Sequence, residues 1–396
     1  MSGSTRSVIV AGARTPTGKF RGAFSGLKAV ELGAHAIRAA VERAGIAGEQ
    51  VDYTILGHVL QAGAGQITSL QASIGAGLPK EVPAITLNKV CLSGMSAIAM
   101  ADQMIRAGEI EVAVAGGMES MTNAPYVLPK GRAGSRLGDA ELIDSMIHDG
   151  LWSSFLDHHM GEGTDEVSAE FGLTRGEQDA WAARSHQRAH AAWTSGRMAD
   201  EVVPIEIPQG KEATVTVDRD EGIRPDSTPE KLAELKPAFR ADGTITAGNA
   251  SQISDGACAV VVMSTERAQE LGVAALAEIV AYGMSADRYP SLHTVPAMAL
   301  ERALKKSGLA ASDLGLIEIN EAFAAVPIHA SRMLGAEEDI VNVNGGAVAL
   351  GHPIGASGAR IVLTLIMEMR RRGIDLGGAA ICGGGGQGDA LVIRRI

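Results

Sequence analysis

Two residues far apart in the chain, Cys91 and His352, have the types and surroundings of a nucleophile and its base. Cys91 precedes a stretch of Gly, Ser, Ala, Ile and Met that predicts a helix, and the positive end of a helix stabilises a thiolate. His352 stands at a second predicted helix start, with Pro353 at the first helical position. A small buried thiol and a satisfied core histidine are the alternatives. A fold that pairs the two would make a Cys–His nucleophile.

A second thiol, Cys382, opens a glycine-rich run that ends at Gly388. Gly383, Gly385 and Gly388 have the spacing of a dinucleotide-binding fingerprint. That fingerprint needs a following helix and an acidic residue about 20 positions further on. Too little chain remains for either, and residues 390–393 predict a strand. The glycines instead favour backbone N–H groups that approach a developing oxyanion beside the thiol.

Three further places in the sequence hold a residue type that can carry chemistry: an asparagine, a pair of histidines and the remaining cysteine. Asn320 follows a predicted strand, at the carboxyl edge where α/β proteins place ligands, and could hold a water or simply form a turn or N-cap. His158 and His159 suggest a metal, but no second ligand pair has suitable spacing and adjacent side chains point apart, so no metal is expected. Cys258 lies in an apolar run and is expected in the core of a strand.

The elements that must position these residues alternate as in an α/β fold of layered sheets and helices. The clearest strands are predicted at residues 8–11, 54–56, 112–115, 258–263 and 316–319, and the clearest helices at residues 30–44 and 298–307. An internal repeat is also visible, because aligning Cys91 with His352 superimposes Gly94 on Gly355 and Ser96 on Ser357. A predicted strand ends 34 residues before Cys91 and 32 residues before His352. The chain is therefore predicted to contain two similar halves.

The segment between the halves differs in composition. Residues 119–250 hold five of the ten histidines and many charges and prolines, which predicts a more exposed inserted domain. We expect three units: an N-terminal half of residues 1–121 plus 252–275, an inserted loop domain of residues 122–251, and a C-terminal half of residues 276–396. A chain of 396 residues is long enough for several packed units.

Composition narrows the class of protein. The net charge of −11 argues against nucleic-acid binding and against a polybasic membrane surface. No apolar stretch is long enough for a membrane span, residues 1–7 carry no signal peptide, and Ile396 does not end a peroxisomal signal. Three scattered cysteines fit a reducing compartment, so a cytoplasmic protein is expected.

Across its whole length the chain resembles the thiolase family. The matching segments are VIVAGARTPTGKF at Val8, NKVCLSGMSAIAMA at Asn88, VAGGMESMTNAPY at Val114, HMG at His159, TAGNASQISDGA at Thr246, NEAFA at Asn320, NVNGGAVALGHPIGASGAR at Asn342 and CGGGGQGDA at Cys382. The resemblance implies two pseudo-symmetric βαβαβαββ halves that form a five-layer αβαβα core.

The resemblance also implies roles for the polar residues. Cys91 would be the acylated nucleophile, His352 its base, and Cys382 the group that takes or returns the α-proton of the second acyl-CoA. One oxyanion hole would consist of His352 and a water held by Asn320, and a second of the N–H groups of Cys91 and Gly384. The implied reaction joins two acetyl-CoA molecules into acetoacetyl-CoA and CoA, or cleaves 3-ketoacyl-CoA.

The resemblance further implies a site for coenzyme A, which would act as a substrate with no permanently bound cofactor. The residues implied to contact it are Leu151, His159, Met160, Arg224, Ser251 and Phe323. The basic residues Lys211, Arg219, Arg224, Lys231, Lys236 and Arg240 would supply a local positive field, with solvated surface charge as the alternative. Family members are usually homotetramers, so a dimer of dimers is expected.

Two departures from the family pattern affect the expected substrate. Glu162 to Asp165 follow the HMG motif where many relatives have threonines and alanine, and Leu292 to Pro296 replace a segment rich in Gly and Pro. Acyl-chain length therefore stays open. A decarboxylating β-ketoacyl synthase is the nearest alternative enzyme, but its cysteine is paired with histidines or with histidine and asparagine. A catalytically silent, thiolase-like subunit is the alternative from a different class.

Overall fold

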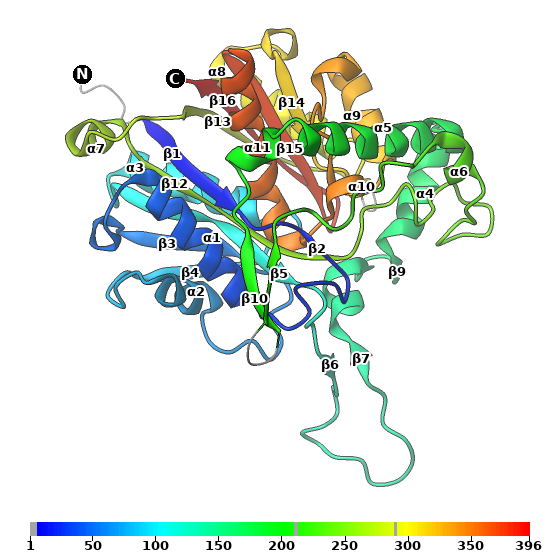
Figure 1. Cartoon of the computed structure of the whole chain (residues 1–396). Helices are drawn as coiled ribbons and strands as arrows, with labels where there is room; N and C mark the ends of the chain where they lie inside the picture. Colours follow the sequence, from blue (N-terminus) through cyan, green and yellow to red (C-terminus); the bar gives the residue numbers. More distant parts are fainter. Residues whose placement is uncertain (1–5, 210–212, 289–290) are drawn as a thin grey trace.

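The computed structural model describes residues 6–209, 213–288 and 291–396 and forms two similar halves (Figure 1). The N-terminal half contains β1 (Ser7–Arg14), α1 (Ala29–Ala44), β3 (Tyr53–Gly57), α2 (Thr68–Ala76), β4 (Ala84–Leu87), α3 (Ser93–Ala107), β5 (Val112–Ser120) and β12 (Ser254–Ser264). The C-terminal half contains β13 (Ala277–Ala286), α8 (Val295–Ser307), β14 (Leu316–Ile319), α9 (Ala325–Leu334), α11 (Ile354–Arg372), β15 (Leu376–Gly383) and β16 (Gln387–Arg395). All seven predicted elements are confirmed within a few residues.

The two halves repeat one strand order. The first runs β4-β3-β5-β12-β1 and the second runs β14-β15-β16-β13. The counterpart of β4 in the second half is reduced to an isolated parallel bridge between Ile317 and Val341. The half-sheets join where β1 pairs antiparallel with β13 at Val8 and Ile9. The predicted internal repeat is therefore confirmed in the order of the elements.

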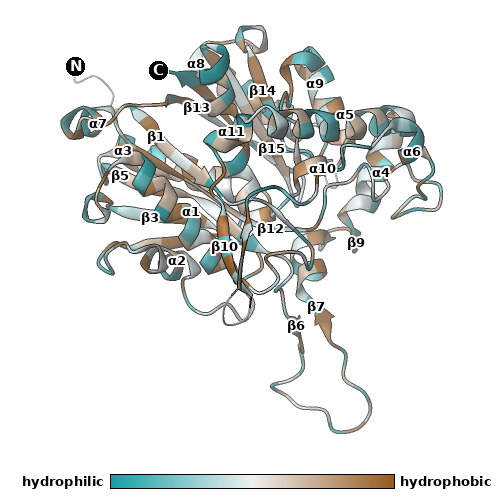
Figure 2. Cartoon of the chain, in the orientation of Figure 1, coloured by the Kyte–Doolittle hydropathy of each residue, from teal (hydrophilic) through white to brown (hydrophobic). Residues whose placement is uncertain are grey.

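The helices make the five layers that the resemblance implied. Helices α1 and α2 cover the outer face of the first half-sheet, α8 and α9 cover that of the second, and α3 and α11 lie between the sheets. The outer helices α1 and α8 carry both hydrophilic and hydrophobic residues (Figure 2), as amphipathic helices do. Every residue of β12 is buried, because central strands are covered on both faces.

The remaining elements belong to the connecting segment and to short turns. The strands are β2 (Gly18–Lys19), β6 (Tyr126–Val127), β7 (Ile143–Asp144), β8 (Trp152–Ser153), β9 (His158–His159), β10 (Ile205–Gln209) and β11 (Ala213–Val217), and the helices are α4 (Met160–Glu170), α5 (Arg175–Thr194), α6 (Pro229–Ala233), α7 (Thr265–Leu271) and α10 (Ala347–Leu350). The loop between β6 and β7 projects away from the body (Figure 1). None of the helices in the described ranges is long and apolar enough to cross a membrane. The three-unit division proposed from the sequence stays a prediction.

Glycines let the two central helices touch. A Cβ atom at Gly94 of α3 would lie 2.8 Å from the backbone nitrogen of Ala359, and one at Gly358 of α11 would lie 2.5 Å from that of Met95. Such distances are below van der Waals contact, so α3 and α11 cross backbone to backbone near their starts. The crossing brings the segments just before the two helices, which hold Cys91 and His352, to one place.

A substitution at this crossing tests how closely the helices pack. Gly358→Ala should lower the free energy of unfolding by about 1–3 kcal/mol, because the new methyl group forces backbone apart. Gly176→Ala is the matched control, since Gly176 lies in α5 with open space around it and should lose nothing or gain up to about 1 kcal/mol. Thermal unfolding of both variants checks this. Equal midpoints for the two would contradict the close crossing.

Candidate active site

Cys91 lies in a strained turn between β4 and α3. The preceding residue, Val90, has φ 51°, a left-handed conformation that is costly for a β-branched side chain. Hydrogen bonds hold the turn: the Ser93 hydroxyl donates to the carbonyl of Val90 at 2.6 Å and accepts from the N–H of Lys89 at 2.8 Å. Backbone strain that neighbouring bonds enforce is typical of a position that must present one side chain.

The thiol of Cys91 is buried, and burial raises its pKa to about 12. The N–H groups of Cys91 and Gly384 hydrogen-bond the sulfur and act in the opposite direction. Backbone N–H groups near the helix start thus favour the thiolate, as the sequence indicated, while the loss of water on burial opposes it more strongly. The resting residue is a thiol that needs a base.

His352 lies between α10 and α11, and its tautomer follows from its neighbours. Its Nδ1 is 2.6 Å from the Ser357 hydroxyl, which donates its own proton to the carbonyl of Pro353 at 3.0 Å. The hydroxyl oxygen therefore accepts from Nδ1–H, which leaves a lone pair on Nε2. Burial, and then the charge of Arg360, lower the pKa of His352 to about 3. A neutral imidazole with a free Nε2 can accept a proton. Pro353 itself is the N-cap of α11, one position before the predicted one.

Cys382 is the residue before the last in β15 and faces the same place. The glycine run forms the hairpin between β15 and β16, as expected from the strand that follows it and unlike a dinucleotide fingerprint. A Cβ atom at Gly383 would lie 2.7 Å from the Leu92 side chain, and one at Gly384 would lie 3.3 Å from Val90. Burial and the charge of Cys91 raise the pKa of Cys382. The two thiols are thus close enough to interact electrostatically.

Asn320 joins this group from the end of β14. Its side chain is fully buried, and Nδ2 lies 3.4 Å from Nε2 of His352. The N-cap alternative is wrong, because the next helix, α9, begins after Ala324. The structure therefore brings Asn320 and His352 together, and it brings Cys91, Cys382 and Gly384 together. Their catalytic roles stay predictions.

A cavity of about 300 Å³ opens at this junction. It is lined by Asn88, Lys89, Val90, Asp149, Trp152, Ser153, Ser154, Phe155, Met160, Leu292, Gly384, Gly385, Gly386 and Gln387. Met160 was a predicted contact of coenzyme A, and Leu292 comes from the segment that departs from the family pattern. The rest of the wall combines two aromatic rings and three glycines with polar or charged side chains, which suits a flexible chain that carries both apolar and hydrogen-bonding groups.

None of the other predicted contacts of coenzyme A is among the residues that line this cavity. The ring centroids of His159 and Trp152 lie 4.9 Å apart. Phe239 lies between His159 and Phe323, with its ring centroid 6.0 Å from that of His159 and 6.1 Å from that of Phe323. Leu151 packs against the hydrophobic cluster that contains Cys91. The N–H of Ser251 donates to the carbonyl of Ala322, next to Phe323. Arg224 is exposed and does not line the cavity.

The predicted basic field is weaker than the sequence indicated. Lys231 pairs with Asp226, and Arg240 pairs with Glu166 and Asp242. The guanidinium of Arg219 lies 5.9 Å from the ring of Trp193. Arg224 and Lys236 are exposed, whereas Lys211 lies outside the described residues. Pairing favours the surface-charge alternative for Lys231 and Arg240.

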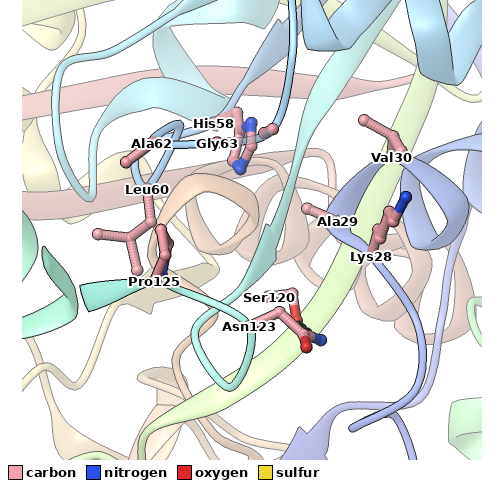
Figure 3. Close-up of a pocket in the computed structure, with 11 residues that line it drawn as sticks. Lys28, Ala29, Val30, His58, Leu60, Ala62, Gly63, Ser120, Asn123 and Pro125 are labelled. Carbon is pink, nitrogen blue, oxygen red and sulfur yellow. Dashed lines mark hydrogen bonds between the residues drawn. The ribbon is translucent and has the colours of Figure 1, made fainter. Parts of the chain in front are cut away.

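Several residues that support the site were missed in the sequence. Glu119 is a buried carboxylate that accepts from the N–H groups of Val59, Leu60 and Gly355, and burial raises its pKa to about 7. It lies 3.4 Å from Nε2 of His58, at the wall of a separate cavity of about 260 Å³ (Figure 3). The motif at Val114 contained Glu119, but nothing in the sequence indicated where its carboxylate points.

Asp389 is a second residue of this kind. Its carboxylate is fully buried on β16 and binds the ammonium of Lys89 at 2.7 Å and the hydroxyl of Ser96 at 2.6 Å. Lys89 belongs to the turn that presents Cys91. Asp389 therefore ties that turn to the strand that follows Cys382. The signal in the sequence was the alignment of Ser96 with Ser357, whose hydroxyls both serve site residues.

Comparison with known proteins points in one direction. The family model described as the thiolase N-terminal domain matches residues 7–266, and that of the thiolase C-terminal domain matches residues 273–395. A probable acetyl-CoA acetyltransferase of Mycolicibacterium smegmatis is 54% identical over 98% of this chain and 100% of the relative. The acetyl-CoA acetyltransferase of Pseudomonas aeruginosa is 52% identical over 98% and 99%.

A solved structure agrees with the sequence comparisons. The crystal structure of the Bacillus anthracis acetyl-CoA acetyltransferase superimposes with a TM-score of 0.97, at 41% identity, over 100% of both chains. Family, relatives and fold thus coincide over nearly the whole length. The chain belongs to the thiolase family.

Proposed function

We propose that this chain is an acetyl-CoA C-acetyltransferase. It transfers an acetyl group from coenzyme A to Cys91 and joins it to a second acetyl-CoA, giving acetoacetyl-CoA and CoA, and it also runs the reverse cleavage. The names of its close relatives support acetyl-CoA as the substrate. The observation that carries the proposal is that the N–H of Gly384, two residues after Cys382, hydrogen-bonds the sulfur of Cys91, while Gly383 packs against Leu92, so that the two thiols share one site.

Acylation of Cys91 is the first step. Nε2 of His352 takes the thiol proton, and the thiolate attacks the carbonyl carbon of acetyl-CoA. The carbonyl oxygen becomes negative and accepts hydrogen bonds from the N–H groups of Cys91 and Gly384. When the tetrahedral intermediate collapses, the C–S bond to coenzyme A breaks and the leaving thiolate takes the proton of Cys382. An acetylated Cys91, a protonated His352 and a Cys382 thiolate remain.

Condensation follows because acylation changes the charge beside Cys382. Burial and a Cys91 thiolate both raise the pKa of Cys382, and a thioester at Cys91 cannot carry the thiolate charge. The Cys382 thiolate left by the acylation step therefore persists and takes the α-proton of the second acetyl-CoA. The enolate oxygen is held by His352 and a water on Asn320. Its carbon attacks the thioester, and the released Cys91 thiolate recovers its proton from His352.

We propose that the substrate chain lies in the cavity that contains Met160 and Leu292, with Leu151, His159, Ser251 and Phe323 beside the pantetheine and Arg224 nearer the nucleotide. Coenzyme A and its thioesters act as substrates, with no permanently bound cofactor.

We also propose a cytoplasmic homotetramer in fatty acid metabolism. The loop between β6 and β7 is the observation that favours contacts between subunits, because it projects from the body and its Leu137 is 99% exposed. The inserted segment of residues 122–251 would contribute both the contacts with coenzyme A and those between subunits. Acetoacetyl-CoA and longer 3-ketoacyl-CoA are the substrates of the cleavage direction.

Replacement of the nucleophile tests the first step. Cys91→Ser should abolish the acetyl labelling of the protein by acetyl-CoA, because a serine hydroxyl ionises far less readily than a thiol. Mass spectrometry of protease-digested protein measures it, with Cys258→Ser as the control that keeps full labelling. Undiminished labelling in Cys91→Ser would refute the assignment. A wild-type protein without labelling would instead favour a silent subunit.

Replacement of the second thiol separates the two steps. Cys382→Ala should still accept the acetyl group on Cys91, but its condensation rate should fall by about a hundredfold to ten-thousandfold, because the α-proton loses its base. Exchange of the acetyl-CoA methyl protons in deuterated water should fall in parallel. Condensation at the wild-type rate would reject the two-thiol cycle and leave the acyl-transfer step standing.

The size of the cavity leads to an expectation for chain length. Thiolysis of acetoacetyl-CoA should have a higher kcat/KM than thiolysis of a 3-keto substrate with about ten further carbons, because Met160, Leu292 and Phe155 bound the space near the thiols. Leu292→Ala should make the two kcat/KM values more similar, since a smaller side chain leaves room for the longer substrate and each methylene group gains roughly 0.8 kcal/mol on burial. A longer substrate that matches acetoacetyl-CoA in the wild type would overturn the assigned chain length.

A further inference from the structure

A buried arginine contacts the amide of Asn320 from the side opposite His352. Arg360 lies in α11, and its Nη2 donates to Oδ1 of Asn320 at 3.5 Å, while Nδ2 of the same amide lies 3.4 Å from Nε2 of His352. Nη1 of Arg360 lies 3.5 Å from Oε2 of Glu318, two residues before Asn320 on β14. The Arg360 and Glu318 side chains are only 7% and 3% exposed. These side chains form a continuous row from Glu318 to His352.

The chemistry of this row leaves one orientation for the amide. A guanidinium carries donors only, so the end of the Asn320 amide that faces Arg360 must be the oxygen. The NH2 end then points to His352, whose Nε2 carries a lone pair because Nδ1–H donates to Ser357. A flipped amide would place NH2 against the guanidinium and an oxygen against the lone pair. Both contacts would be repulsive.

We propose that Arg360, held in place by Glu318, is a positioning residue that fixes the Asn320 amide with its NH2 group toward the reacting oxygen. The inference rests on the proposed thiolase cycle, in which that NH2 group holds a water for the enolate oxygen. A site for a developing negative charge needs a donor that is already oriented, since turning it during the reaction would cost part of its effect. Arg360 supplies this orientation without touching the substrate.

The contact with Glu318 is by itself a weak reason for the arginine to be there, because burial raises the pKa of Glu318 to about 8 and so disfavours its charged form. At 3.5 Å, Nη1 of Arg360 and Oε2 of Glu318 have no hydrogen-bond partner among the described residues. Buried ion pairs without good hydrogen bonds often contribute little net stability, because removing two charges from water costs as much as their attraction returns. Burial lowers the pKa of His352, and the charge of Arg360 lowers it further, so Arg360 helps to keep the base neutral. Both consequences serve the site.

A double-mutant cycle tests the positioning role. Arg360→Lys keeps the charge but removes the planar fork of donors, so kcat for acetoacetyl-CoA thiolysis should fall by about tenfold to a hundredfold, with KM within about twofold. Asn320→Ala should lower kcat by about a hundredfold or more, as expected on loss of an oxyanion donor. When both changes are combined, Arg360→Lys should have no further effect, because no amide is left to orient.

Two comparisons make the cycle decisive. Arg43→Lys is the control: Arg43 is exposed, its guanidinium donates to the carbonyls of Gly12 and Asp200, and its replacement should leave kcat unchanged in both backgrounds. If Arg360→Lys does not fold, Glu318→Gln takes its place, since it frees Arg360 while keeping the shape of the side chain. Glu318→Gln should lower kcat less than Arg360→Lys does, and this loss should likewise disappear when Glu318→Gln is combined with Asn320→Ala.

The outcomes separate this inference from the proposed function. An equal fractional loss of kcat in the wild-type and Asn320→Ala backgrounds would show a purely structural effect and overturn the positioning role. Full activity of Asn320→Ala would also overturn the positioning role, because Arg360 would then have no functional amide to orient. Turnover by the wild type would in that case still support the thiolase activity. A wild type that neither condenses nor cleaves would reject the proposed function instead.

Discussion

The site depends on one contact, the backbone-to-backbone crossing of α3 and α11. Gly94 and Gly358 leave no side chain between the two helices, so their starts, and the residues that precede them, come together although Cys91 and His352 lie in opposite halves of the chain. Helices that carry larger residues at a crossing stay about 8–10 Å apart. The low aromatic content and the 49 glycines of this chain therefore have a direct function, since they let backbone segments approach.

Around that crossing, polar groups from both halves hold the reactive atoms by short hydrogen bonds. Ser357 sets the tautomer of His352, and Asp389 ties the turn before Cys91 to the strand after Cys382. Burial favours the protonated form of both thiols and the neutral form of the imidazole, so these three reacting side chains carry no charge that would have to be stabilised without substrate. Charge then develops only where backbone N–H groups and an oriented amide can receive it. This separation of resting and reacting states suits a reversible acyl transfer.

Much of this arrangement could be predicted from the sequence, for identifiable reasons. Residues 316–319 match β14, because a short, mainly apolar run between polar neighbours is typical of a buried strand in an α/β chain. The alignment of Cys91 with His352 revealed the two halves, since a repeated unit keeps its glycines at close contacts. The raised pKa of Cys91 could not be predicted, because a helix dipole is visible in a sequence, whereas the depth of burial is not.

The roles of Arg360 and Glu119 were missed for a related reason. Both lie within motifs that were recognised, but a motif says nothing about which way a charged side chain points. For Arg224 the resemblance implied a contact with coenzyme A, and in the structure of the single chain its side chain is exposed.

The most direct measurement is cross-linking of the two site thiols. A short bifunctional thiol reagent, applied to the native protein and followed by digestion and mass spectrometry, should join the peptides of Cys91 and Cys382 within one subunit. Prior incubation with acetyl-CoA should prevent the bridge, because the acetyl group occupies Cys91. Independent modification of the two thiols, with no bridged peptide, would contradict a single site built from both halves.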